Sequence, residues 1–205
     1  MATVGVEKII LGIDPGTNVM GYAVLQVVER KPQLIVMGAL SLNKLESHYL
    51  RLKRIHERVL GLIEQYHPDE LAIESPFVGI NPSSMIKLCR AQGVAMAAAV
   101  VRDIPIFEYP PAKVKIQIVG NGAASKEQVA AMVKQTLHLS DDDMKAKFDA
   151  SDAVAIALTH HYTTIKPEAL RSRGGGGIKI PTSSGSGSKS WGEFIARNSD
   201  RVHGR

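Results

Sequence analysis

Four acidic side chains stand where a catalytic site could form. Two of them end short apolar runs: Asp14 follows the run IILGI, and Glu74 follows LAI. The other two, Asp149 and Asp152, open an apolar segment and are three residues apart, so both fall on one face of a helix's first turn. If the two runs are neighbouring parallel strands, Asp14 and Glu74 meet at the sheet edge where sites form in such folds.

Carboxylates gathered at one place repel one another, so a site that collects them usually binds a cation. Oxygen ligands with no cysteine nearby suit hard ions such as Mg²⁺ or Mn²⁺. Two such ions about 4 Å apart can activate a water molecule and stabilise the leaving oxygen of a phosphodiester. Beside a basic surface, this cluster favours metal-dependent hydrolysis of a nucleic acid.

Each carboxylate also has a structural explanation. Asp14 precedes a Pro-Gly pair typical of turns, and Glu74 precedes Ser-Pro at the end of a strand. Asp149 and Asp152 fit the N-cap and N3 positions of a helix, where carboxylates stabilise the helix by about 0.5–2 kcal/mol. Only the expected convergence of the four favours catalysis.

The elements that must position these side chains follow from hydrophobic periodicity. Apolar runs predict strands at 9–14, 21–28, 34–42, 70–74 and 104–109, the first three as an antiparallel meander. Helical spacing predicts helices at 44–67, 82–102, 111–120 and 125–138, and a last helix from near residue 149. This order predicts an α/β fold, a five-stranded mixed sheet with helices on both faces, in which strands 9–14 and 70–74 are parallel neighbours.

Charge and composition divide the chain. Residues 1–165 carry 17 Lys and Arg against 17 Asp and Glu, whereas residues 166–205 carry 8 against 3 and include Gly- and Ser-rich stretches. We therefore expect a nuclease domain at 1–165 and a flexible basic tail at 166–205. Such a tail suggests a polyanionic partner, although it could simply improve solubility.

The single cysteine, Cys89, excludes an internal disulfide and a multi-cysteine zinc site, and it fits a reducing cytoplasm. No stretch approaches the roughly 20 apolar residues of a membrane span. The N-terminus lacks the pattern of a signal peptide. We expect a cytoplasmic protein with no membrane partner.

The chain resembles the RuvC crossover-junction endodeoxyribonucleases, within the RNase H-like superfamily. The resemblance lies in the segments IILGIDPGTNVMGYAV, LAIESPF, KLCRAQGVAMAAAV, IFEYPPAKVKIQIVGNGAASKEQV and DASDAVAIALTH. They follow the family's order across residues 9–162, which is far more specific than GIDPG alone, a motif also similar to the phosphate-binding opening of actin-like kinases. The resemblance does not extend usefully into 166–205.

The resemblance implies an RNase H-like fold and a homodimer that binds a four-way (Holliday) DNA junction. Such an enzyme nicks two strands of like polarity symmetrically during recombination and repair. Its catalytic, metal-binding acids would be Asp14, Glu74, Asp149 and Asp152. Two Mg²⁺ ions would occupy each active site, with Mn²⁺ as a substitute.

Three further residues match DNA-binding positions of the family. Phe77 matches an aromatic residue that enters among the junction's central bases, and stacking there is worth about 1–3 kcal/mol. Lys115 and Lys126 match basic residues beside the scissile phosphate. Without the resemblance, Phe77 would be an ordinary core residue and both lysines solvated surface residues.

The helix at 82–102 is rich in small residues, and Gly93 and Ala97 are four apart, so another helix could approach closely on that face. Packing on the domain's own sheet and a dimer interface are both compatible with this pattern. The resemblance further implies coupling to a RuvAB-like branch-migration complex. His160 and His161, near the end of the last helix, receive no functional role.

The chain departs from the family at a few positions. The family often has a basic residue at the position of Ala112 and a glutamine at that of Ile116, and Pro76 stiffens the segment between Glu74 and Phe77. These departures leave the acids intact but affect the expected positioning of the substrate.

Two other functions compete with the nuclease. An actin-like phosphotransferase would need a second glycine-rich phosphate loop and an adenosine site, for which the chain is too short. A non-catalytic module that recognises branched DNA would be favoured by loss of an acid, and all four are present. ATP hydrolysis would identify the first alternative, and absence of metal-dependent nicking the second.

Overall fold

The computed structural model describes residues 6–76, 81–140, 142 and 150–165. The proposed tail at 166–205 lies outside this part of the chain. The division into domain and tail therefore stays a prediction.

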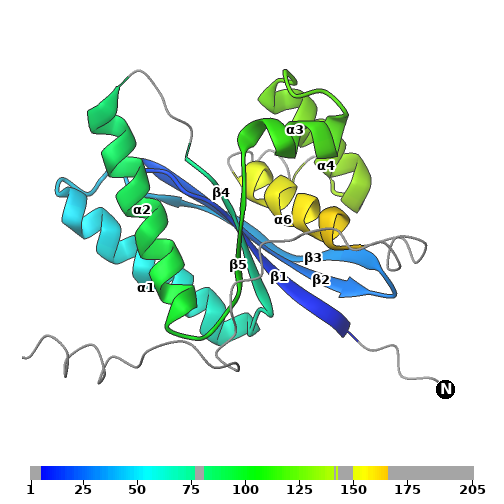
Figure 1. The fold of residues 1–205 in the computed structure, drawn as a ribbon, viewed down its shortest axis with the longest axis horizontal. Coiled ribbons are helices and arrows are strands. Elements are labelled where there is room, and N and C mark those ends of the chain that lie inside the picture. Colours follow the sequence, from blue (N-terminus) through cyan, green and yellow to red (C-terminus); the bar gives the residue numbers. More distant parts are fainter. Residues whose placement is uncertain (1–5, 77–80, 141, 143–149, 166–205) are drawn as a thin grey trace, which may run out of the picture. The chain divides into compact units, whose positions relative to one another are not determined.

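A five-stranded sheet forms the centre of the domain, with the strand order β3-β2-β1-β4-β5 (Figure 1). The strands are β1 (Val6–Asp14), β2 (Val19–Val28), β3 (Lys31–Ser41), β4 (Glu70–Glu74) and β5 (Ile106–Tyr109). The first three form an antiparallel meander, while β4 pairs in parallel with both β1 and β5. The predicted mixed sheet is confirmed, including the parallel pairing of β1 and β4.

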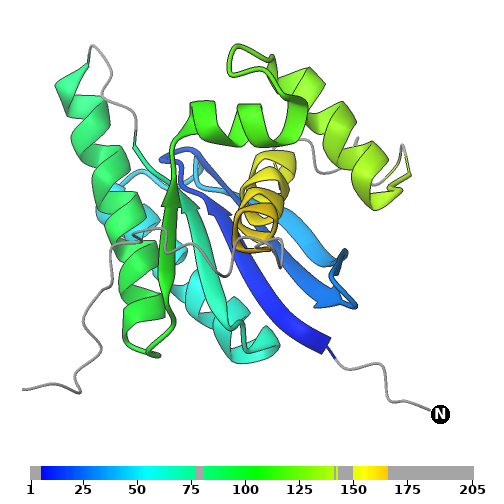
Figure 2. The same ribbon diagram turned by 45° about the vertical axis from the view of Figure 1, so that its right-hand side comes forward.

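Helices cover both faces of this sheet, as predicted. They are α1 (His48–Tyr66), α2 (Pro82–Val100), α3 (Pro111–Val119), α4 (Lys126–Leu137) and α6 (Ser151–Thr164). Helices α1 and α2 pack on one face, and α6, with α3 and α4 around it, packs on the other (Figures 1 and 2). None of these helices is both long and apolar enough to cross a membrane.

Strand β1 serves two cores because successive side chains point to opposite faces. Leu11 and Ile13 are fully buried against the α1–α2 layer, and Ile10 is fully buried on the α6 side. This explains why the sequence shows a continuous apolar run instead of an alternating one.

Gly12 controls how closely α6 approaches the sheet. A Cβ atom at this position would lie 2.3 Å from the backbone oxygen of Ala153 and 2.8 Å from the Cβ of Ala157. Only glycine leaves room for this contact. The first turn of α6, which carries Asp152, is thereby placed against β1 two residues before Asp14.

Helix boundaries follow the capping residues. The predicted start of the first helix at residue 44 is wrong: α1 begins at His48 because the Ser47 hydroxyl accepts a hydrogen bond from the Tyr49 backbone N–H. The predicted cap at Ser125 is confirmed, since its side chain and that of Gln128 form a reciprocal capping box at the start of α4.

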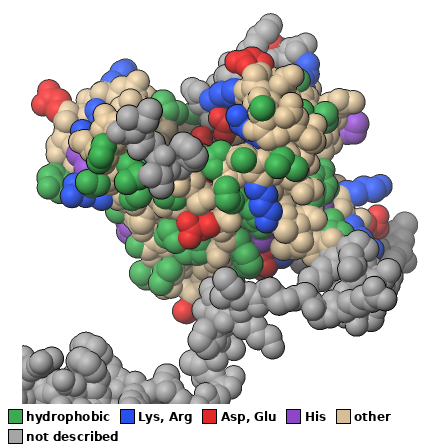
Figure 3. Space-filling view, turned by 45° about the horizontal axis from the view of Figure 1, so that its top comes forward, with side chains coloured by type: hydrophobic (Ala, Val, Ile, Leu, Met, Phe, Trp, Pro, Cys, Tyr) green, Lys and Arg blue, Asp and Glu red, His purple; other side chains and the backbone are tan. Residues whose placement is uncertain are grey.

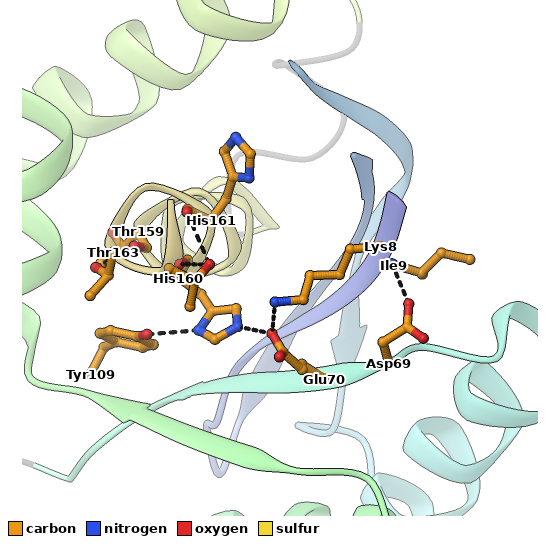
Figure 4. A network of polar contacts seen from close by, with 10 residues as sticks. Lys8, Ile9, Asp69, Glu70, Tyr109, Thr159, His160, His161 and Thr163 are labelled. Atoms are coloured by element: carbon orange, nitrogen blue, oxygen red, sulfur yellow. Dashed lines mark hydrogen bonds and ion pairs between the residues drawn. The ribbon is translucent and has the colours of Figure 1, made fainter. Parts of the chain in front are cut away.

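Under α6 lies a polar group that we call the His160 cluster, comprising Lys8, Glu70, Tyr109 and His160 (Figure 4). The Glu70 carboxylate pairs with Lys8 and with Nε2 of His160, whose side chain is fully buried. Nδ1 of His160 lies 2.7 Å from the Tyr109 hydroxyl oxygen. Both ring nitrogens of His160 have partners within the fold, which is the position of a structural histidine.

Candidate active site

Two of the predicted acids end neighbouring parallel strands. The register pairs Ile13 of β1 with Ile73 of β4. The next residues, Asp14 and Glu74, therefore lie side by side at the carboxyl ends of the two strands. This arrangement matches the expectation from the sequence. Both residues are partly buried.

The third acid, Asp152, comes from the second position of α6. This helix begins at Ser151, with Ala150 as its N-cap and no side-chain capping bond. Asp152 Oδ2 lies 3.0 Å from the Nζ atom of Lys126, the first residue of α4. An acid from α6 and a lysine from α4 therefore face each other across the site.

These side chains line a pocket of about 220 Å³. Its lining residues are Glu74, Pro111, Val114, Lys115, Lys126, Val129 and Asp152. In the space-filling view, acidic side chains lie in a recess with Lys or Arg side chains beside it (Figure 3). The structure thus brings four of the predicted site residues to one pocket, next to the strand that ends at Asp14.

Charge inside the pocket is unevenly compensated. Burial, reinforced by the negative charge of Asp152 and partly opposed by Lys115, raises the pKa of Glu74 to about 7. Near neutral pH, a substantial fraction of Glu74 therefore remains protonated. A cation placed between Glu74 and Asp152 would lower the pKa of Glu74 again, as expected for a metal-binding pair of carboxylates.

A divalent ion fits the donor set, because these carboxylates offer the oxygen ligands that hard cations prefer. Asp14 could contribute a third carboxylate from the neighbouring strand end. In the part of the chain that the structure describes, however, no three His, Cys, Asp or Glu side chains are close enough to hold an ion together. Asp149 lies outside the described residues, as does Phe77.

Sequence analysis missed the apolar wall of the pocket. Pro111 is four residues before Lys115, and Val129 is three residues after Lys126. Helical spacing from the two lysines would have identified these two, whereas Val114, directly before Lys115, could not be found in this way. Outside this wall, Ala112 and Ile116 lie exposed on α3, and Ile116 retains 57% of its accessible surface.

Comparison with known proteins gives consistent results. A family model described as "Crossover junction endodeoxyribonuclease RuvC" matches residues 10–160. Proteins named Crossover junction endodeoxyribonuclease RuvC from Bacteroides fragilis and Porphyromonas gingivalis are 53% and 50% identical over 196 residues. These matches cover 96% of this chain in both cases, and 96% and 97% of the relatives.

Alignments of this length must extend well into residues 166–205, so the earlier interpretation that this segment has no usable match is corrected. Among solved structures, Thermus thermophilus RuvC in complex with a Holliday junction substrate is 32% identical. It has a TM-score of 0.68 and covers 77% of this chain and 94% of its own. Nucleases of this family depend on divalent metals.

The match over residues 10–160, the identity over nearly the full length of two relatives and the structural similarity to the Thermus thermophilus protein agree with one another. The chain belongs to the RuvC family of crossover junction endodeoxyribonucleases.

Proposed function

We propose that this chain resolves four-way DNA junctions by cutting two strands of like polarity through metal-dependent phosphodiester hydrolysis. The observation that carries this proposal is the pocket in which Glu74 and Asp152 face Lys115 and Lys126. The Thermus thermophilus relative bound to a Holliday junction supports the choice of substrate.

In this proposal Asp14, Glu74, Asp149 and Asp152 bind two Mg²⁺ ions, which Mn²⁺ can replace. When bound, the ions supply Lewis-acid stabilisation to the attacking and leaving oxygens of an in-line displacement. The protein's own contribution is to hold the carboxylates at fixed strand and helix ends, so that little reorganisation accompanies the reaction.

Lys115 and Lys126 act on the phosphate itself. Both line the pocket, and a lysine ammonium neutralises a phosphate without reading the base sequence. Phe77, three residues after Glu74, would stack on an unpaired base at the centre of the junction. Pro76 would stiffen the segment that connects them.

A homodimer through α2 would supply the two sites that paired nicks require. One stripe of this helix is exposed and combines apolar with small side chains: Ile86, Cys89, Gly93, Ala97 and Val100. Among the described residues, a Cβ atom at Gly93 would meet nothing within 4 Å, so packing within this part of the chain does not explain the glycine. Close approach of the same helix from a second copy explains it better.

Two leucine substitutions test the dimer. Gly61, on the exposed side of α1, also has open space at its Cβ position and serves as a matched control. We expect Gly93→Leu to shift the chain from dimer to monomer in sedimentation equilibrium, and Gly61→Leu to leave it dimeric. If both variants remained dimeric, the dimer interface would not lie on α2.

The wider setting completes the proposal. The enzyme would act in the cytoplasm and receive junctions from a RuvAB-like branch-migration complex. The basic segment 166–205 would add salt-sensitive contacts to DNA. Removing this segment should reduce the dependence of junction affinity on salt concentration, and an unchanged slope would exclude it from DNA binding.

The decisive experiment uses an end-labelled synthetic junction, with linear duplex of matching sequence as control. Paired symmetric nicks on the junction alone, abolished by EDTA and by Asp14→Asn, are the expected result. Tight binding without cleavage in either Mg²⁺ or Mn²⁺, over several sequences, would instead identify a binding module. Ala112 and Ile116 would then be the first residues to revert to the family pattern.

A further inference from the structure

Gln92 lies on the sheet-facing side of α2, where most buried residues are apolar. Only 6% of its surface is accessible, and its neighbours along the buried face are alanines such as Ala91, Ala95 and Ala98. A buried amide costs free energy unless its donors and acceptors are paired. Its contacts therefore indicate why this position is polar.

The Nε2 group of Gln92 contacts two acceptors at the carboxyl ends of β4 and β5. It donates one hydrogen bond to the backbone oxygen of Glu74, at 3.2 Å, and another to the Glu108 carboxylate, at 2.9 Å. An amide nitrogen has two N–H donors, so these two bonds use both of them.

The Glu74 peptide needs this support because the strand ladder ends there. Glu74 and Tyr109 are the last paired residues of β4 and β5, and beyond them one further bond joins the Ser75 N–H to the Tyr109 oxygen at 3.0 Å. Strand β5 is at the edge of the sheet and only four residues long. Gln92 adds an anchor from the helical layer at this point.

We propose that Gln92 is a positioning residue that fixes the Glu74 peptide, and through it the Glu74 carboxylate, relative to α2. It directly precedes Gly93 of the exposed α2 stripe, so the residue that holds the Glu74 backbone is next in sequence to the proposed dimer surface. The inference rests on the proposed function, in which Glu74 is a metal ligand and α2 the dimer helix. Placement errors near 1 Å can cost roughly 100-fold in rate, so the anchor matters for catalysis.

If Gln92 had only a structural role, its bond to Glu108, which joins α2 to β5, would be sufficient. Exchanging the two side chains separates this structural role from the positioning of Glu74. Gln92→Glu combined with Glu108→Gln exchanges the amide and the carboxylate, so the bond between the two side chains is kept. The Glu74 backbone oxygen, however, then faces a carboxylate in place of an N–H donor. Gln92→Leu removes both bonds while keeping the position filled and apolar.

The test measures kcat and KM for junction cleavage and the melting temperature of each variant. We expect Gln92→Leu to lower kcat by about 10- to 100-fold with KM changed less than threefold. The swap variant should regain only part of the lost melting temperature, because the Glu74 oxygen still lacks a donor, and it should not regain kcat. Glu108→Gln alone, whose new amide can still accept the bond from Gln92, should remain near wild type in both.

Recovery of kcat together with melting temperature in the swap variant would overturn the proposal, as would normal kcat in Gln92→Leu. Glu74→Gln is assayed in parallel. If Glu74→Gln cleaves normally, the assignment of the acid is wrong; if it is inactive while the Gln92 variants are normal, only the positioning role is wrong.

Discussion

Strand β4 has a glutamate at each end, and the two have opposite environments. Burial acts to raise the pKa of Glu70, but hydrogen bonds from His160 and Lys8 outweigh it, so the pKa is lowered from its ordinary 4.5. Burial and the nearby Asp152 raise the pKa of Glu74 to about 7. Only three residues of one strand separate a compensated carboxylate from an incompletely compensated one.

In the proposed function, charge stabilises the fold at one end of β4 and serves the chemistry at the other. Around Glu70 the partners come from the chain itself, and the Tyr109 hydroxyl remains protonated because burial and the Glu70 charge raise its pKa to about 12. Around Glu74 the compensation is incomplete, which leaves a site for an external cation. The predictions below test whether stability and activity separate in this way.

The largest effect is expected from Asp152→Asn. Loss of one carboxylate from the proposed metal site should lower the cleavage rate by roughly 1000-fold, about 4 kcal/mol of transition-state stabilisation, while junction binding is retained. Initial rates on a labelled junction and gel-shift titration measure the two quantities. Glu70→Gln is the matched control and should keep its rate; a comparable loss of rate in both would erase the contrast.

Glu70→Gln should instead lower the free energy of unfolding by about 1–3 kcal/mol, since Lys8 and His160 lose their charged partner. A carboxyl whose pKa is lowered on folding stabilises the protein above its ordinary value of 4.5 and loses this contribution as pH falls through the lowered pKa. Urea unfolding from pH 8 down to pH 3 should therefore show the two proteins converging in acid. A gap that persists at low pH would assign the loss to packing.

In EDTA, Glu74→Gln should raise the free energy of unfolding, whereas Glu70→Gln lowers it. With the pKa raised to about 7, ionisation of Glu74 costs nothing below 4.5, an increasing amount between 4.5 and about 7, and the full amount above. At pH 8 the variant should gain about 1–2 kcal/mol over wild type, and the gain should vanish near pH 4. Urea denaturation at the two pH values checks this, and a variant less stable than wild type at pH 8 would contradict it.

Substitutions of Lys126 at the pocket and Lys8 in the His160 cluster give the smallest predicted effects. Lys126→Ala should reduce the cleavage rate about tenfold, equivalent to 1.4 kcal/mol, with little change in melting temperature. Lys8→Ala should lower the melting temperature by a few degrees, at about 1 kcal/mol, and leave the rate unchanged. The cleavage rate and the melting temperature of both variants test this prediction. If Lys8→Ala lost rate and Lys126→Ala lost stability, the contrast between the two ends of β4 would be wrong.

Sequence reasoning predicted the features that local patterns encode. The apolar run before Asp14 and the Ser125 cap depend on residues within one element, and both were found where expected. The edge shared by Asp14 and Glu74 followed from general rules for parallel strands. The start of α1 was missed because Ser47 resembles several earlier residues as a candidate cap.

Long-range polar pairs could not be predicted. Glu70 and His160 are 90 residues apart, and Gln92 reaches Glu74 and Glu108 from a helix that reads as small and apolar. No periodicity indicates which buried polar side chain will find which partner, because the partner is chosen by how the layers pack. Part of the apolar wall of the pocket, in contrast, could have been predicted from helical spacing, since Pro111 is four residues before Lys115 and Val129 three after Lys126.

The contact of Gly12 with Ala153 also ties assembly of the proposed site to synthesis of the chain through α6. The first strand and the last helix of the domain meet there, across 141 positions of the chain, so the contact is among the least local in the fold. Because a long loop must close before this contact can form, assembly of the proposed site waits for α6. A nascent chain still lacking α6 has no Asp152, so the site cannot form before this helix has been synthesised and has packed on β1.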